Sequence, residues 1–197
     1  IASGAKLANP DLHVWLVTGD GDAMSIGGNH FIHLLRRNLN LNILLFNNRI
    51  YGLTKGQYSP TSTPGTRSPS TPAGSIDTPI NATSLALGAG GGFVARTVDT
   101  FQDHLPEMLS RAHSFKGAAL IEVLQNCIVY NDNAFGDLSS KKSRAENTVI
   151  VRHGEPMIFG SERDKGLTYE PERGGFRTSD NIDKICIHDE TNWAMAA

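Results

Sequence analysis

Several features are scarce in this 197-residue sequence, and each absence argues against a class of protein. Only two cysteines occur, Cys127 and Cys186, with no C-x-x-C pair, which disfavours a disulfide scaffold and leads us to expect a cytoplasmic location. The net charge is only −2, which gives no reason to expect nucleic acid or an anionic membrane surface as a partner. No apolar run approaches the roughly 18 residues that a membrane-spanning helix needs, and no signal-peptide pattern is present.

The chain is nevertheless long enough to bury a substantial core. Its length suggests one domain with an appendage. The sequence opens on Ile1, without a methionine, in what resembles the middle of a helix, so we treat it as a fragment.

Segments typical of strands and of helices alternate through the first two thirds of the chain. Apolar β-rich runs predict strands at residues 14–17, 42–46, 93–96 and 118–124. Helical spacing predicts helices at residues 28–39, 82–87 (capped by Asn81, with a glycine stop at 88–92) and 103–113. Strand–helix–strand units of this length place their strands parallel. We therefore predict an α/β fold, an open and mostly parallel sheet with helices on both faces, over residues 1–135.

Two stretches depart from this alternation. Residues 58–79, "YSPTSTPGTRSPSTPAGSIDTP", hold five of the nine prolines. The composition is typical of a surface linker, but structureless loops of this length inside a domain are usually lids or binding loops. Residues 136–197 form a peripheral, irregular extension in which "VIVRHGEPMIFG" and "DKICIHDE" predict short strands and "ERDKGLTYEPERGG" predicts turns.

The stretch "TGDGDAMSIGGNHF", residues 18–31, combines glycines with acids directly after an apolar strand. It contains no Gly-Lys-Ser/Thr, so it is not a phosphate loop of the nucleotide hydrolases. Met24 stands both where a dinucleotide fingerprint needs its third glycine and where a calcium loop needs its fifth-position oxygen. His30 and His33 are expected as packing or surface residues rather than as a metal pair.

The position of Asp20 predicts a cation. Ligands of open α/β sheets bind beyond the carboxyl ends of strands, and glycines with a helix amino end suit a phosphate. A carboxylate would repel that phosphate unless Mg²⁺, which prefers oxygen ligands, lay between them. The next strand ends in "FNNRIYG", where the Asn48 side chain and the Ile50 carbonyl are candidate ligands.

These motifs carry a family resemblance. "GDGD" followed by "LLFNN", with Gly19 and Asn48 29 positions apart, resembles the thiamine-diphosphate motif of thiamine-dependent enzymes. "KLANPDLHVWLVTGDGDAMSIGGNHFIHLLRRN", "LLFNNRIYGLTKGQYSPTS" and "GSIDTPINATSLALGAGGGFVAR" resemble the β subunit of 2-oxoacid:ferredoxin oxidoreductases, especially the 2-oxoglutarate type. The resemblance runs to about Phe135.

The resemblance implies a set of ligands. Magnesium would be bound by Asp20, Asn48 and the Ile50 carbonyl. The diphosphate would be surrounded by Gly19, Asp20, Gly21, Asp22, Asn48, Tyr51, Gly52, Leu53 and Thr54. Asp22 has an alternative role as a helix N-cap.

Two further residues acquire roles from the resemblance. Lys55 would pair with the distal carboxylate of a 2-oxo dicarboxylate; the alternative is an ordinary exposed loop lysine. Cys127, after the strand "AALIEVL", would ligate a [4Fe–4S] cluster with cysteines upstream of this fragment; the alternative is a buried free cysteine, which is what we expect of Cys186.

The resemblance also implies partners. No glutamate precedes Glu107, so the glutamate that activates the thiamine is expected on the α subunit, and no catalytic residue is assigned in this chain. The reaction would be oxidative decarboxylation of a 2-oxoacid, with coenzyme A taking the acyl group and ferredoxin the electrons. The alternatives are a non-redox thiamine enzyme, of the decarboxylase or acetolactate-synthase type, and a degenerate subunit kept for binding or assembly.

Overall fold

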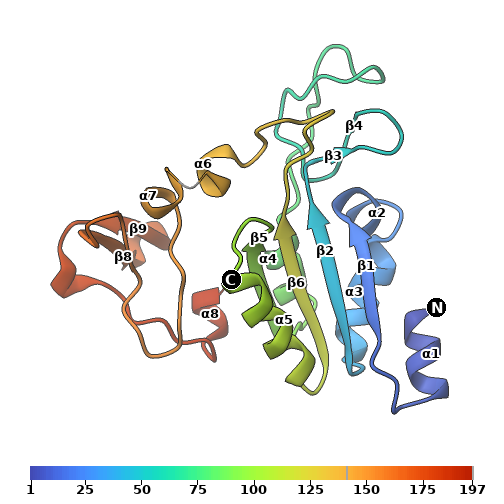
Figure 1. Cartoon of the computed structure of the whole chain (residues 1–197), viewed down its shortest axis with the longest axis horizontal. Coiled ribbons are helices and arrows are strands. Elements are labelled where there is room, and N and C mark those ends of the chain that lie inside the picture. The colour runs from blue at the N-terminus through green and yellow to red at the C-terminus, as the bar shows by residue number, and fades with distance from the viewer. Residues whose placement is uncertain (141, 197) are drawn as a thin grey trace. The chain divides into compact units, whose positions relative to one another are not determined.

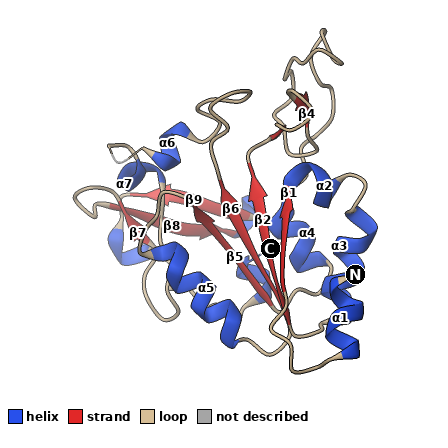
Figure 2. Cartoon of the chain, turned by 45° about the vertical axis from the view of Figure 1, so that its right-hand side comes forward, coloured by secondary structure: helices blue, strands red, loops and turns tan. Residues whose placement is uncertain are grey.

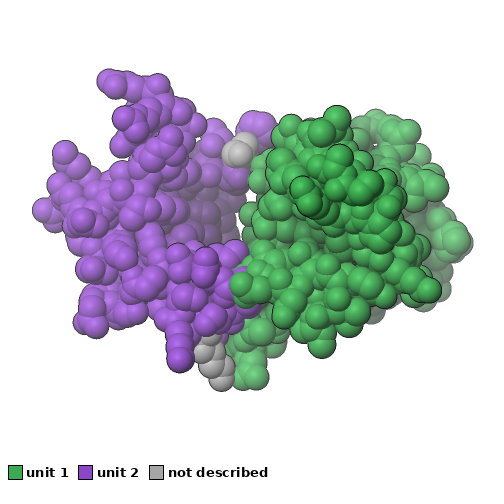
Figure 3. All heavy atoms as spheres, turned by 90° about the horizontal axis from the view of Figure 1, so that it is seen from above, with its two compact units in different colours: residues 1–135 green, residues 136–197 purple. Residues whose placement is uncertain are grey.

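The computed structural model describes residues 1–140 and 142–196, in two compact units. The units are Ile1–Phe135 and Gly136–Ala197, coloured separately in Figure 3. Within the described ranges, no helix has the length and apolar character needed to cross a membrane.

The first unit is built on a four-stranded parallel sheet, as predicted. The spatial order of its strands is β1-β2-β6-β5, and all three pairings are parallel. Each strand coincides with a predicted apolar run to within two residues at either end, and the run at residues 118–124 is matched without change. The bounds are Trp15–Gly19 for β1, Leu41–Asn47 for β2, Phe93–Val98 for β5 and Ala118–Leu124 for β6.

Helices cover both faces of this sheet, which confirms the predicted class (Figure 2). On one face α2, α3 and α4 bury residues such as Leu35 and Ala86 against Ile43. On the other face α5 packs Ala112 against Ile121 and Val123. The helices are α1 (Ala2–Ala8), α2 (Asp20–Met24), α3 (Gly28–Arg37), α4 (Ala82–Gly88) and α5 (His104–Ser114).

Local sequence explains the ends of these helices. The Asn81 side chain accepts a hydrogen bond from the backbone N–H of Ser84, so the predicted cap of α4 is confirmed. Gly90 follows with a φ of +85°, a left-handed conformation that glycine adopts readily, and the glycine run ends the helix.

A short hairpin and a long loop extend beyond the carboxyl ends of β1 and β2 (Figure 1). The hairpin pairs β3 (Ile50–Tyr51) with β4 (Gln57–Tyr58). The loop over residues 58–79 is closed at its base, where the Tyr58 hydroxyl donates to Asp77 at 2.9 Å and the Ile80 N–H donates to the Pro60 carbonyl at 2.8 Å. The hydrogen bond to Asp77 raises the pKa of Tyr58. The loop therefore folds back on itself rather than trailing as a linker.

The second unit contains more regular structure than its sequence suggests. Its three-stranded antiparallel sheet has the order β7-β8-β9, with bounds Ile158–Phe159, Lys165–Glu170 and Gly175–Ser179. The short helices are α6 (Gly136–Ser139), α7 (Arg144–Asn147), η1 (Pro171–Arg173), η2 (Ile182–Lys184) and α8 (Trp193–Ala196).

Three predictions for this unit are wrong. The stretch expected to form turns supplies β8, because Tyr169 packs edge-on against Phe176 of β9; turns remain at residues 162–163, before β8, and at η1 and Gly174, after it. The strand expected in "DKICIHDE" is reduced to η2 and a single bridge between Pro156 and Ile187. Cys186, expected as buried, is partly exposed.

A surface ion pair in this unit, between Lys165 and Glu146, leads to a prediction about the pKa of Glu146. The Lys165 ammonium donates to Glu146 at 2.6 Å, and this bond, with those from Ser161, lowers the pKa of Glu146 to about 2. A lowered pKa contributes stability that is present above the unfolded value of roughly 4.3 and is lost as the pH falls toward 2. We expect Lys165→Met to raise the pKa of Glu146, measured by carbon-13 NMR of its carboxyl group. An unchanged titration would show that Lys165 does not set this pKa.

Candidate cofactor site

Three strand ends bring the predicted site residues to one edge of the sheet. Gly19 of β1 pairs with Phe46 of β2, and Asn47 pairs with Leu124 of β6. This register places Asp20 beside Asn48, and the two are joined directly, because the Asn48 N–H donates to Asp20 Oδ1 at 3.4 Å. The two sequence motifs that carry Asp20 and Asn48 therefore lie together at the carboxyl edge of the sheet, as predicted.

Asp20 is the first residue of α2 and is almost fully buried, with 2% of its surface exposed. Its Oδ2 accepts hydrogen bonds from the hydroxyls of Ser59, at 2.5 Å, and Thr61, at 2.6 Å. Among the residues that the structure describes, its Oδ1 has only the long contact to Asn48. A buried carboxylate is destabilised unless hydrogen bonds replace its lost hydration. Here hydroxyl donors do so for Oδ2 more strongly than the backbone donor does for Oδ1.

The predicted magnesium ligands form an all-oxygen set at this edge. Asn48 Oδ1 accepts a hydrogen bond from the Ile50 N–H at 3.2 Å. This bond closes a local turn, orients the Asn48 amide and leaves the second lone pair of the oxygen available for a cation. Carboxylate, amide and main-chain oxygens suit Mg²⁺. In the described ranges no three His, Cys, Asp or Glu side chains gather as a metal site, so a mixed oxygen set is what this edge offers. The donor chemistry fits magnesium.

The glycines at this edge differ in what surrounds them. A Cβ on Gly21 would lie 2.3 Å from the Tyr51 ring, and the Tyr51 hydroxyl donates to the Gly21 carbonyl at 2.8 Å. The Tyr51 ring therefore leaves no room for a side chain at position 21. A Cβ on Gly19 would meet nothing within 4 Å. Gly19 is the N-cap of α2, so the alternative role of Asp22 as N-cap is wrong; Asp22 is exposed in the first turn.

Residues 52–56 form a tight turn beside this edge. The Gly56 N–H donates to the Tyr51 carbonyl at 2.8 Å, and Lys55 has a φ of +75°, which is uncommon for a residue with a side chain. Leu53, Thr54 and Lys55 are exposed at the tip of the turn. Backbone strain of this kind tends to occur at functional sites.

Cys127 packs against the same turn. A Cβ on Gly52 would lie 3.7 Å from the Cys127 sulfur, and a Cβ on Gly56 would lie 3.0 Å from the Tyr130 ring. The Asn131 side chain ties this segment to the site, because it donates to the Asn48 carbonyl at 2.9 Å. Cys127 is partly exposed and forms no disulfide. The fold therefore brings Cys127, Lys55 and the magnesium candidates into one neighbourhood.

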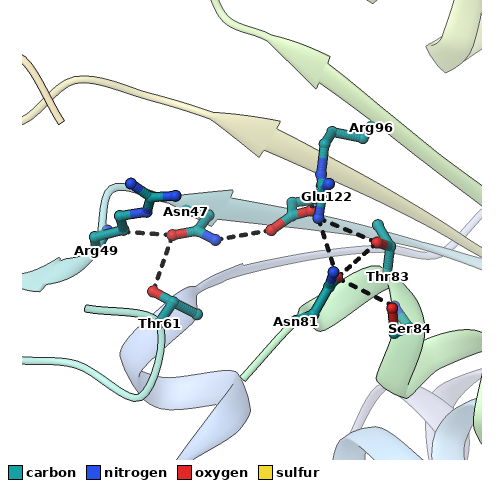
Figure 4. Close-up of polar contacts among 8 residues, drawn as sticks. All are labelled: Asn47, Arg49, Thr61, Asn81, Thr83, Ser84, Arg96 and Glu122. Atoms are coloured by element: carbon teal, nitrogen blue, oxygen red, sulfur yellow. Dashed lines mark hydrogen bonds and ion pairs between the residues drawn. The ribbon is translucent and has the colours of Figure 1, made fainter. Parts of the chain in front are cut away.

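A buried polar network, absent from the sequence prediction, runs from this edge into the sheet (Figure 4). Asn47 donates to Glu122 at 2.7 Å, and Arg96 donates to the other Glu122 oxygen at 2.6 Å. Arg96 also reaches Asn81, the cap of α4. Glu122 is 1% exposed, and its charge inside the apolar strand "AALIEVL" was the sequence signal that should have drawn attention to it.

Arg49 closes the edge on the side of Phe135. Its guanidinium lies 4.3 Å from the Phe135 ring centroid and donates to the Ala134 carbonyl at 3.3 Å. Burial, with the positive charge of Arg96, lowers the pKa of Arg49, although arginine stays protonated in proteins. A fixed positive charge beside the candidate site favours an anionic ligand.

The parallel sheet and the oxygen-rich carboxyl edge together define an α/β domain with a ligand site beyond the ends of its strands. The family model described as "Thiamine pyrophosphate enzyme, C-terminal TPP binding domain" matches residues 1–123, and the chain belongs to this family. The predicted resemblance is thereby confirmed at the level of the domain.

Individual relatives share more of the chain. It is 53% identical over 195 residues to the 2-oxoglutarate oxidoreductase subunit KorB of Mycobacterium tuberculosis, covering 96% of this chain and 51% of that protein. It is 43% identical over 129 residues to the 2-oxoglutarate synthase subunit KorB of Methanocaldococcus jannaschii, covering 66% and 48%. The chain thus spans about half the length of these curated relatives.

A solved structure is similar as well. The 2-oxoglutarate:ferredoxin oxidoreductase from Magnetococcus marinus, with 2-oxoglutarate, coenzyme A and succinyl-CoA bound, matches with a TM-score of 0.66 and 38% identity, covering 68% of this chain and 46% of that chain. The fold and the family resemblance predicted from the sequence agree with these similarities.

Proposed function

We propose that the chain is the thiamine-diphosphate-binding part of the β subunit of a 2-oxoacid:ferredoxin oxidoreductase that acts on 2-oxoglutarate. The observation that carries the proposal is the 53% identity to a 2-oxoglutarate oxidoreductase subunit across nearly the whole chain. The oxygen donors at the carboxyl edge of the sheet support it. A cytoplasmic location belongs to the proposal too.

In this proposal the chain holds the cofactor and positions it. Asp20, Asn48 and the Ile50 carbonyl would hold Mg²⁺, and the diphosphate would lie among Gly19, Gly21, Asp22 and residues 51–54. Thiamine diphosphate supplies the carbanion chemistry that decarboxylation of a 2-oxoacid requires. The protein contributes orientation, charge balance and exclusion of water.

The net reaction we propose uses two molecules of ferredoxin, each of which accepts one electron. The 2-oxoacid loses carbon dioxide, its acyl group passes to the coenzyme A sulfur, the proton of that thiol is released, and the two electrons leave one at a time for ferredoxin. Cys127 would ligate the [4Fe–4S] cluster that carries them, with other cysteines from the longer protein. The position of Cys127 against the turn that bears Lys55 supports this role.

A partner subunit completes the proposal. The two glutamates of the first unit are Glu107 and Glu122, and Glu122 is buried and held by Asn47 and Arg96, so it does not face a ligand at the edge. The activating glutamate is assigned to the α subunit, as the family resemblance implies. Leu53, 99% exposed, and Ile128 and Val129, more than 70% exposed, present apolar surface at the site, as expected where a partner packs.

The function is tested with the full-length protein and its α subunit, purified without oxygen. We expect reduction of ferredoxin that depends on 2-oxoglutarate, coenzyme A and thiamine diphosphate together. Decarboxylation without ferredoxin reduction would favour a non-redox thiamine enzyme. Failure of both reactions in an intact, cofactor-loaded complex would favour a subunit kept for binding or assembly.

Substrate choice gives a residue-level prediction. If Lys55 pairs with the distal carboxylate, Lys55→Asn should weaken 2-oxoglutarate much more than pyruvate; asparagine tolerates the left-handed backbone of this position and removes the charge. Truncating a buried charge pair typically costs about 2–5 kcal/mol, so the ratio of the two kcat/KM values should shift more than tenfold.

The control for Lys55→Asn is Lys116→Asn, which changes an exposed lysine two residues before the amino end of β6. It should leave the ratio unchanged. Equal losses for both substrates in Lys55→Asn would mean that the lysine serves the diphosphate or only the turn.

A further inference from the structure

The two oxygens of the Asp20 carboxylate have different environments. Oδ2 accepts from Ser59 and Thr61 at 2.5 and 2.6 Å, whereas Oδ1 has one long contact, to the Asn48 N–H at 3.4 Å. The two hydroxyl residues are 2% and 4% exposed and come from the start of the 58–79 loop, about 40 positions away in the sequence. Two buried hydroxyls thus converge on a single carboxylate oxygen.

The rest of the network fixes the direction of the Thr61 hydroxyl. Glu122 accepts hydrogen bonds from Arg96 and from Asn47. Because an ionised carboxylate accepts hydrogen bonds and donates none, the Asn47 NH₂ group must face Glu122, and the Asn47 side-chain oxygen must face Thr61. That oxygen already accepts the Arg49 N–H at 3.1 Å. Thr61 has a single proton, and its contact to Asp20, at 2.6 Å, is shorter than the 3.0 Å to Asn47. The proton therefore goes to the charged acceptor.

The loop segment that carries these hydroxyls is itself anchored. The Ser62 hydroxyl accepts from the Ser59 N–H at 2.8 Å and donates to the Arg49 carbonyl at 2.6 Å. Arg49 lies between the two magnesium candidates Asn48 and Ile50 in the sequence. Residues 59–62 therefore pack, largely buried, against the turn that provides two of the three candidate magnesium ligands.

We propose that Thr61 and Ser59 are positioning residues for the magnesium ligand Asp20. They hold Oδ2, and because the two oxygens of a carboxylate diverge, they turn Oδ1 toward Asn48 and the cation. Partners that orient a ligand in this way commonly tune metal affinity. The loop is then a support for the metal site rather than a lid. This inference rests on the proposed function of the site.

The test is a magnesium titration of the full-length protein with its α subunit, stripped of cofactor, at a fixed concentration of thiamine diphosphate and followed by calorimetry. Thr61→Val keeps the side-chain volume and removes the hydroxyl. Thr61→Ser keeps the hydroxyl. Thr63→Val changes an exposed threonine of the same loop and is the matched control.

We expect Thr61→Val to raise the half-saturating magnesium concentration about 10- to 100-fold, the usual effect of losing a partner that orients a metal ligand. Thr61→Ser and Thr63→Val should titrate like the unchanged protein. Ser59→Ala should shift the titration in the same direction and replaces Thr61→Val if that variant does not assemble. An unshifted titration, or a shift that Thr61→Ser does not restore, overturns the proposal.

A further variant, Asp20→Asn, separates this inference from the proposed function. If the unchanged protein binds no thiamine diphosphate with magnesium, the proposed function fails and the positioning role falls with it. If the unchanged protein binds and Asp20→Asn does not, while Thr61→Val binds normally, only the positioning role is wrong.

Discussion

Replacing Asp20 by asparagine is expected to weaken binding of Mg²⁺ and thiamine diphosphate by about a hundredfold or more, because losing even an outer partner of a metal ligand typically costs 10–100-fold. Asparagine keeps the shape of the side chain and an oxygen that Ser59 and Thr61 can still reach. It removes the negative charge that offsets the cation beside the diphosphate. Affinity falls through the metal rather than through misfolding.

The measurement is calorimetry on the assembled complex, with cofactor and magnesium titrated separately. Asp11→Asn is the control, because Asp11 is exposed and precedes the amino end of the same strand, β1. Thermal unfolding of the cofactor-free complexes checks that the two variants assemble alike. Unchanged affinity in Asp20→Asn would show that the magnesium site has been assigned to the wrong residue.

Replacing Cys127 by serine is expected to abolish the [4Fe–4S] cluster while thiamine diphosphate still binds. Four thiolates are the usual set for such a cluster, and a serine hydroxyl is a poor substitute for one of them. Cys127 lies near Gly52, and none of the hydrogen bonds described for it involves Asp20 or Asn48. The loss should therefore be confined to the cluster.

The test is anaerobic purification of the full-length heteromer carrying Cys127→Ser, with iron analysis and paramagnetic resonance of the reduced protein. Cys186→Ser is the matched control, since Cys186 lies in the second compact unit and should leave the cluster signal intact. A full cluster with normal ferredoxin reduction in Cys127→Ser would remove this residue from the electron path. A non-redox thiamine enzyme would then become the better interpretation.

The sequence by itself determined the fold of the first unit and the edge of the sheet at which its candidate site residues meet. Four apolar runs with helical segments between them admit few arrangements other than a parallel sheet covered on both faces. "GDGD" and "NN" follow two of these runs, and carboxyl ends of parallel strands share an edge, so Asp20 and Asn48 had to meet. Each step depends on local periodicity or on a general rule of strand packing.

Tertiary structure alone decided what holds Asp20. Ser59 and Thr61 lie 39 and 41 positions beyond it in the sequence, and nothing in the composition of a proline- and serine-rich loop indicates which hydroxyl points inward. Likewise β8 forms because Tyr169 meets Phe176 across a turn, although its sequence is typical of turns. Hydrogen bonds are short and directional, so they are assigned only once the backbone has fixed where each side chain points.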